Sequence, residues 1–332
     1  MKEGRIGKSG FKTTLQNAFT TTLGNEKWQF ISIPIFAILL SLIAASVVIL
    51  MLGRNPLAAF LNLLQGSGVA LKPSYAAHKN MLTDFMSLLD CMTPMMFAAL
   101  AVAVALRTGL FNIGVSGQML AAGFTATVIV GYSTLGGAAA RPLALIIGLL
   151  AGAAVGVLIG VLKHWFNINE VVTSIMLNYI IMYVVSFFIN NNYIDPVSRQ
   201  SKNVANTARI TLADVTVGDL RMNIPLGIVL AIIIAFIIRF LLNRTRFGYE
   251  MKTVGTNKDA AKYAGIHVGK NIILSMFISG ALAGLAGVTY YMGYYTSIKP
   301  RVLASVGFDS IAVALLGNSN PVGIIFSSFL IT

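Results

Sequence analysis

Polar side chains recur at helical spacing inside one of the most apolar stretches of this chain. Glu170, Ser174 and Asn178 stand four residues apart in "EVVTSIMLNYIIMYVVSFFIN", so a helix carries them along one face. Polar groups within an apolar segment usually face the protein interior or a water-filled path. We therefore expect this stripe either to line a passage for a polar solute or to hydrogen-bond neighbouring helices.

A second set of polar residues flanks an interruption between two apolar segments. Asn112 and Gln118 stand on either side of "IGVSG", whose glycines free the backbone. Irregular backbone at membrane depth is tolerated where it is buried in protein or lines a cavity. This break is a second candidate for the passage or its gate, and Asp309 is a third. The polar but nearly uncharged set suits an uncharged, hydroxylated solute.

Nothing in the sequence indicates covalent chemistry or metal binding. The chain has one cysteine and three histidines, and the histidines lack the spacing of metal ligands. The "GKS" within "GRIGKSG" is not a phosphate-binding loop, because Lys2 stands where such a loop needs its first glycine. We therefore expect no catalytic residue, no metal and no cofactor in this chain.

The composition is that of a membrane protein. Of the 332 residues, 56% are apolar and 11% are charged, against about 25% charged in an average soluble domain. Apolar runs near 20 residues recur, and each is long enough to cross a hydrocarbon core of about 30 Å as a helix. The net charge of +13 is interpreted as lysines and arginines that face lipid headgroups, not nucleic acid.

These runs predict an all-α, polytopic bundle of about eight to ten spans. The predicted spans are residues 29–52, 84–106, 115–134, 142–162, 170–190, 224–242 and 272–295, with a shorter segment at 304–317 and a run from 322. Pro142 is expected in the first turn of its span. We expect a basic tail at residues 1–28 and a membrane domain at 29–332, whose last span is truncated.

The loop at residues 244–271 gathers six lysines and arginines with two acids in 28 residues. Within it, "TNKDAAKYAG" predicts a short helix: Thr256 caps its start, Asp259 follows three residues later as in a capping box, and Gly265 takes the left-handed position at its end. Ala260 and Tyr263 share one face. Because an interfacial membrane helix needs larger apolar residues, this face predicts docking into a protein groove.

The number of spans between two loops predicts whether they lie on the same side of the membrane. If residues 244–271 are cytoplasmic, then the N-terminal tail, the turn after Arg107 and the turn after Lys163 are cytoplasmic too. The tail carries five lysines and arginines, which agrees with the positive-inside tendency. The sequence thus predicts a multi-pass protein with a cytoplasmic N-terminus.

Four segments resemble the permease subunits of binding-protein-dependent ABC importers: "GLFNIGVSGQ", "NEVVTSIMLNYI", "RTRFGYEMKTVGTNKDAAKYAGI" and "FDSIAVALLGNSNPVGI". The resemblance covers most of residues 85–325 and is nearest to nucleoside permeases, in a branch that also holds ribose-type sugar and branched-chain amino acid permeases. It implies a type II-like permease in a prokaryotic cell membrane. It also implies the partners: two cytoplasmic ATPase domains that bind ATP, a second permease, identical or homologous, and an extracellular solute-binding protein.

The resemblance also implies a coupling helix between the sixth and seventh spans, which is where the basic loop falls. On that basis the coupling residues are Arg246, Gly248, Glu250, Thr256, Asp259, Ala260, Tyr263 and Gly265. One position departs from the family pattern, because members usually carry glutamate where this chain has Ser116.

Two other functions remain open from the sequence. One is a ribose-type sugar permease of the same class. The other is an ion-coupled secondary carrier, which often holds its coupling ion with a carboxylate inside the membrane. Glu170 and Asp90 are the only plausible carboxylates for that role.

Overall fold

The structure, a computed structural model, describes residues 26–332 and divides into two compact units, residues 1–64 and 65–332. Each unit is described by itself. The first contains α2 (Glu26–Met51), which is long and apolar enough to cross a membrane, and most of α3 (Pro56–Gly66). Most of the predicted tail, residues 1–25, lies outside the described residues.

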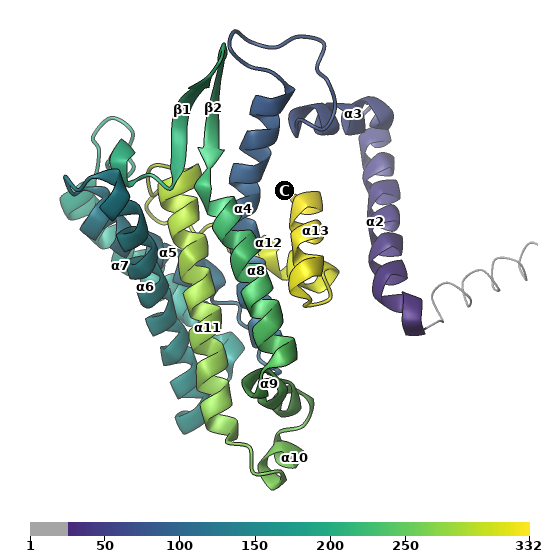
Figure 1. Cartoon of the computed structure of the whole chain (residues 1–332), viewed down its shortest axis with the longest axis vertical. Helices are drawn as coiled ribbons and strands as arrows, with labels where there is room; N and C mark the ends of the chain where they lie inside the picture. The colour runs from purple at the N-terminus through teal and green to yellow at the C-terminus, as the bar shows by residue number, and fades with distance from the viewer. Residues whose placement is uncertain (1–25) are drawn as a thin grey trace, which may run out of the picture. The chain divides into compact units, whose positions relative to one another are not determined.

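The second unit holds the remaining elements (Figure 1). Its α-helices are α4 (Met81–Arg107), α5 (Val115–Ala126), α6 (Gly137–Phe166), α7 (Glu170–Phe188), α8 (Leu226–Arg244), α9 (Arg246–Thr256), α10 (Lys258–Tyr263), α11 (Val268–Thr289), α12 (Val306–Leu316) and α13 (Pro321–Ile331). π-Helical turns extend three of them, η1 (Thr127–Gly131), η2 (Ile189–Tyr193) and η4 (Tyr290–Tyr294), and η3 (Asn206–Ala208) is a 3₁₀ turn.

Six helices of the described chain are long and apolar enough to span a membrane, which confirms the polytopic helical class. The expected span at 115–134 falls instead on a shorter apolar helix, Val115–Gly131. The shorter segment at 304–317 and the run from 322 fall on two further short helices, Val306–Leu316 and Pro321–Ile331, as their lengths predict. At about 1.5 Å per residue, the last two are too short to cross about 30 Å alone.

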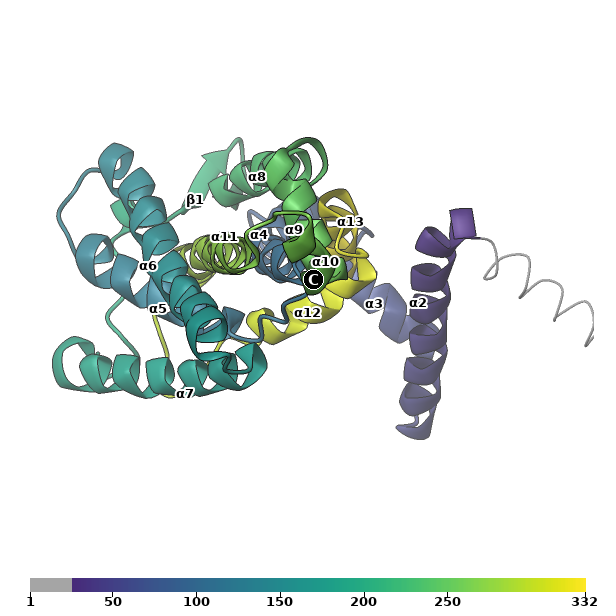
Figure 2. The ribbon, with the colours of Figure 1, turned by 90° about the horizontal axis from the view of Figure 1, so that it is seen from below.

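Helix α4 forms the centre of the second unit. Every residue from Met92 to Ala105 is buried, and a helix that is apolar on all sides is one that its neighbours surround. Seen along the helices, α4 and α11 lie in the middle, with α5, α6, α8, α12 and α13 around them (Figure 2).

Glycines bring α6 and α11 into backbone contact. A Cβ atom added to Gly152 of α6 would lie 2.3 Å from the Gly280 oxygen of α11, and one added to Gly280 would lie 2.4 Å from the Gly152 oxygen. Lipid supplies no hydrophobic drive for helix association, so close van der Waals packing has to hold such helices together. The glycines of α6 and α11 therefore allow the close packing that holds these two helices together.

Two local features were not predicted from the sequence. The polar segment before α8, which lies between the spans predicted at 170–190 and 224–242, contains an antiparallel hairpin of β1 (Thr211–Val217) and β2 (Leu220–Pro225). The hairpin is fastened to α4 by the Thr211 hydroxyl, which donates to Asp90 Oδ1 at 2.6 Å. Pro142 is also not in the first turn of α6, because the helix begins earlier, at Gly137.

Replacing Gly280 by alanine should destabilise the second unit. The new methyl group has to displace the α6 backbone, and overpacking costs about 1–3 kcal/mol. We expect the purified Gly280→Ala protein to melt several degrees below the wild type. Gly136→Ala is the matched control, because nothing lies within 4 Å of its added Cβ; equal melting temperatures for the two variants would contradict the backbone contact.

Candidate functional site

Helix α9 turns sharply away from the end of α8. The Thr245 hydroxyl caps α9 by accepting the Gly248 N–H at 3.1 Å. Gly248 packs directly on the preceding helix, where a Cβ would lie 2.2 Å from the Leu241 oxygen. Only glycine therefore allows α9 to pack this closely on the end of α8.

The short helix predicted in this loop is present, but its start was assigned one residue early. Asn257, not Thr256, caps α10: its side-chain oxygen accepts the backbone N–H groups of Asp259 and Ala260, both at 3.0 Å. Thr256 ends α9 and donates to the Lys252 oxygen. Asparagine takes the cap because its side chain satisfies two N–H groups that a helix start leaves unpaired.

The end and the exposed face of α10 agree with the sequence. Gly265 has φ +77°, the left-handed conformation expected after a helix. Tyr263 is 95% exposed, and Ala260 is exposed as well. Ala261, on the opposite face, is fully buried in a cluster with Leu110 and Val254, so α10 rests on the bundle and presents its other face outward.

Glu250 joins α9 to the beginning of α11. Its carboxylate accepts the Asn271 amide at 3.1 Å and the Arg246 guanidinium at 2.9 Å. The Asn271 hydrogen bond and then Arg246 hold the pKa of the Glu250 carboxyl below its usual value, because both stabilise the charged form. Glu250, Arg246 and Asn271 also line a cavity of about 510 Å³ beside the loop.

The turns after Arg107 and Lys163, which were predicted on the same side of the membrane as the loop at 244–271, lie next to that loop. The turn after α4 contacts the end of α9, since a Cβ on Gly109 would lie 3.1 Å from the Gly255 oxygen. His164, near the end of α6, packs against Gly269 at the start of α11. Figure 1 places α9 and α10 at one end of the second unit and the β-hairpin at the other.

The break between α4 and α5 is held by buried amides. Asn178 of α7 accepts the Gly117 N–H at 2.9 Å and donates to the Ile113 oxygen at 3.0 Å. Asn112 donates to Gln118 at 3.1 Å and to the Ser279 hydroxyl at 2.9 Å. The Asn178 amide thus takes the place of backbone hydrogen bonds that are lost at the break, and the Asn112 amide joins the break to α5 and α11.

Three polar groups near the break have no partner. The hydroxyls of Thr108 and Ser174 and the Gln118 side-chain nitrogen are buried without a hydrogen bond, a condition that costs about 1–3 kcal/mol for each group. The structure thus brings four of the predicted passage residues, Asn112, Gln118, Ser174 and Asn178, to one place. Their role in a passage stays a prediction.

The other two predicted passage residues lie apart from this cluster. Glu170 begins α7 and forms an ion pair with Lys163 at 2.8 Å. Asp309 lies in the first turn of α12 and is exposed. Among the described residues, no group of three His, Cys, Asp or Glu is placed to hold a metal.

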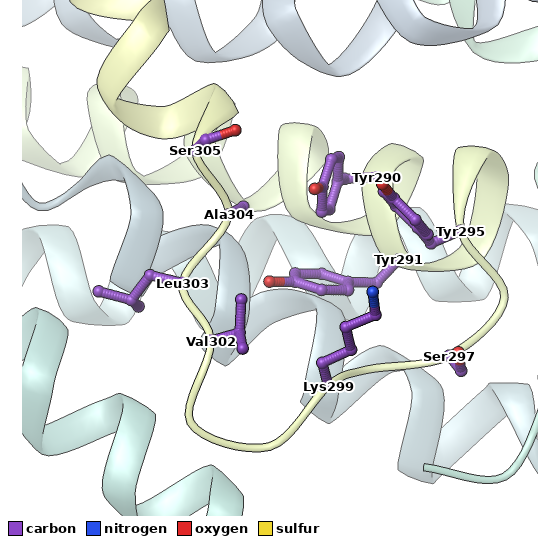
Figure 3. Close-up of a pocket in the computed structure, with 9 residues that line it drawn as sticks. All are labelled: Tyr290, Tyr291, Tyr295, Ser297, Lys299, Val302, Leu303, Ala304 and Ser305. Atoms are coloured by element: carbon purple, nitrogen blue, oxygen red, sulfur yellow. The ribbon is translucent and has the colours of Figure 1, made fainter. Parts of the chain in front are cut away.

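A cavity that the sequence pattern did not predict lies where α11 ends. It has a volume of about 210 Å³ and is lined by Tyr290, Tyr291, Tyr295, Ser297, Lys299, Val302, Leu303, Ala304 and Ser305 (Figure 3). The signal was present in "TYYMGYYTSIKPR", where four tyrosines and a lysine fall close together. The four tyrosines fall within the span predicted at residues 272–295, and no separate role was predicted for them.

Comparison with known proteins identifies a family of membrane permeases, which agrees with the apolar helices described above. Residues 85–332 match a family model described as branched-chain amino acid transport system / permease component. The chain therefore belongs to this family of transport-system permeases, whose members act as membrane subunits and are not themselves enzymes.

Its relatives include permeases of nucleoside transporters. The nucleoside ABC transporter permease protein NupB of Lactococcus lactis subsp. cremoris is 32% identical, over 92% of this chain and 83% of its own length. The guanosine ABC transporter permease protein NupP of Bacillus subtilis is 37% identical, over 92% and 85%. The lactococcal permease protein NupC is 27% identical, over 72% and 76%. No solved structure matches this chain.

Replacing Asn178 by leucine should destabilise the fold. The change leaves the Gly117 N–H and the Ile113 oxygen without their side-chain partner, at about 1–3 kcal/mol for each group that stays unsatisfied. We expect a lower melting temperature for Asn178→Leu in detergent. Tyr179→Leu, at the next position but 54% exposed, should melt close to the wild type. If both variants melt alike, the amide does not hold the break.

Proposed function

We propose that this chain is the membrane-spanning subunit of an ATP-driven importer, and that its solute is a nucleoside. The observation that carries the proposal is the similarity over 92% of the chain to permeases named for nucleosides and guanosine. The exposed helix α10, mounted between two membrane helices, supports the ATP-driven mechanism because it offers a lever that a separate subunit can grip.

In this proposal, two cytoplasmic ATPase domains bind and hydrolyse ATP. The ATPase domain next to this chain holds α10 through Tyr263 and Ala260. Closure of the ATPases displaces α10, whose buried Ala261 packs in one cluster with Leu110. Leu110 belongs to the turn that leads into the break between α4 and α5. A displacement of α10 is therefore transmitted through Leu110 to the edge of the buried amide cluster.

In this cycle ATP drives transport only because the ATP-bound ATPases bind one conformation of the permease more tightly than the other. ATP shifts the transporter toward one conformation to the extent that the ATP-bound subunits bind that conformation more tightly. The chain supplies the lever and the path. In the same proposal the lever end, with the N-terminus, faces the cytoplasm of a prokaryotic cell, and an extracellular binding protein delivers the solute at the other end.

We also propose a second, homologous permease as the partner in the membrane. The lactococcal relatives include two permease proteins named for nucleoside transport, NupB and NupC, and this chain is similar to both. Two different chains give an asymmetric pair, so each chain can present its own residues to the solute.

The family assignment favours an ATP-driven importer over an ion-coupled carrier. Both carboxylates that a carrier would need already have partners in the chain: Asp90 accepts the Thr211 hydroxyl, and Glu170 is paired with Lys163. Of the two ATP-driven functions considered, nucleoside or sugar import, the names of the similar permeases favour the nucleoside.

The solute can be tested with the reconstituted transporter. We expect nucleosides, presented on the binding protein, to stimulate ATP hydrolysis in proteoliposomes, and ribose and glucose to leave it at the basal rate. Uptake should continue after proton and sodium gradients are dissipated while ATP is kept constant. Stimulation by a sugar alone, or collapse of uptake with the ion gradients, would show that the proposed function is wrong.

Tyr263→Arg should abolish uptake without unfolding the chain. The side chain is 95% exposed, so the change leaves the bundle intact while a large charge enters the proposed ATPase contact. Wild-type melting temperature and lost association with the ATPase are the expected measurements. Val197→Arg, which is 92% exposed in the loop between η2 and β1, is the control and should transport normally. Normal uptake by Tyr263→Arg would remove the docking role of α10.

A further inference from the structure

The tyrosine-lined cavity lies where α11 passes into the π-helical turn η4, at the end of α11 away from α9 and α10. π-Helical turns occur frequently at functional sites. The cavity volume of about 210 Å³ is below the roughly 300–1,000 Å³ of pockets that enclose a whole drug-sized ligand. Its size therefore suits one ring system of a larger solute.

Three serine hydroxyls hold the loop that forms one wall of this cavity. Ser201 accepts the Ile298 N–H at 2.8 Å, Ser186 accepts the Arg301 N–H at 2.7 Å, and Ser116 donates to the Ala304 oxygen at 2.9 Å. The three serines come from three separate parts of the chain: α5, α7 and the loop before β1. The wall is thus formed before any solute arrives, which lowers the ordering cost of binding.

The opposite wall is aromatic. The rings of Tyr290 and Tyr295 have centroids 5.0 Å apart, and those of Tyr290 and Tyr291 are 4.9 Å apart at 89°. Figure 3 shows the Tyr291 side chain crossing the cavity and the Lys299 amino group directed toward it. Aromatic faces with one cationic donor suit a planar, uncharged ring that carries hydrogen-bond acceptors.

We propose that this cavity is the nucleobase subsite of the transporter, where Tyr295 stacks on the base and the Lys299 ammonium donates to a ring carbonyl. The inference rests on the proposed nucleoside function and adds a specificity to it. A lysine pairs well with the O6 and N7 acceptors of a 6-oxopurine, whereas adenine presents an amino donor at the O6 position. The site should therefore prefer guanosine to adenosine.

Ser116 is a positioning residue in this proposal. Its hydroxyl holds Ala304 in the cavity wall, and it is the position where members of the resembling family usually carry glutamate. The subsite is therefore connected to the break between α4 and α5, because Ser116 lies in the first turn of α5.

The test uses the complete transporter in proteoliposomes, with one binding protein at saturation for every variant, and measures uptake of radiolabelled guanosine and adenosine. Because the binding protein is the same throughout, a change in selectivity comes from this chain. Tyr295→Ala should lower uptake of both nucleosides about tenfold, and Tyr295→Phe should keep it. Lys299→Gln should lower the guanosine-to-adenosine ratio about tenfold.

Matched controls separate the cavity from its surroundings. Tyr294 is as exposed as Tyr295, at 41%, but does not line the cavity, so Tyr294→Ala should transport normally. Lys202→Gln removes an exposed positive charge outside the cavity and should leave the ratio unchanged. Co-purification of the ATPase with each variant shows that it has assembled.

Two results would overturn the inference while leaving nucleoside import intact: assembled Tyr295→Ala and Lys299→Gln transporters with wild-type rates and ratio, or Tyr294→Ala and Lys202→Gln with the same losses. A wild-type transporter that takes up ribose but neither nucleoside would instead overturn the proposed function, and the subsite with it.

Discussion

A backbone N–H or C=O inside a bilayer finds no water, so it needs a partner within the protein. The break between α4 and α5 meets this constraint through Asn178, whose amide bonds both the Gly117 N–H and the Ile113 oxygen. Loss of that side chain would leave both backbone groups unsatisfied, at about 1–3 kcal/mol each. The irregular segment on which the proposed passage depends is stabilised by this amide and by Asn112, which accepts the Gly114 N–H.

Helix α11 runs from one end of the second unit to the other and contacts the break between α4 and α5 on the way. Near its start, Asn271 bonds Glu250 of α9, and in its middle Ser279 accepts the Asn112 amide beside the break. At its end the helix passes into η4 and the tyrosine-lined cavity. Backbone contact between Gly152 and Gly280 joins α11 to α6, and α11 itself contacts the loop helices, the amide cluster and the cavity.

Local patterns predicted much of this architecture correctly. The long apolar runs mark the six helices of residues 26–332 that are long and apolar enough to span a membrane, because hydrophobic length is a property of consecutive residues. The sequence also predicted the small exposed face of α10 and the left-handed glycine that follows it, since helix capping depends on a few neighbouring residues. The error at Thr256 arose because Thr256 and Asn257 are both good caps and stand side by side. Their order of preference depends on where α9 ends, which local sequence does not specify.

The sequence by itself determined that the chain is a polytopic helical membrane protein with one charged, helix-forming loop between two spans. Hydropathy and capping are short-range, so no fold was needed to see them. The tertiary structure decided which polar residues meet: it brought Ser174 and Asn178 to the break, left Asp309 apart, and tied Ser116, Ser186 and Ser201 to one cavity wall. These contacts join residues up to 188 positions apart, and only the packing of the helices selects such pairs.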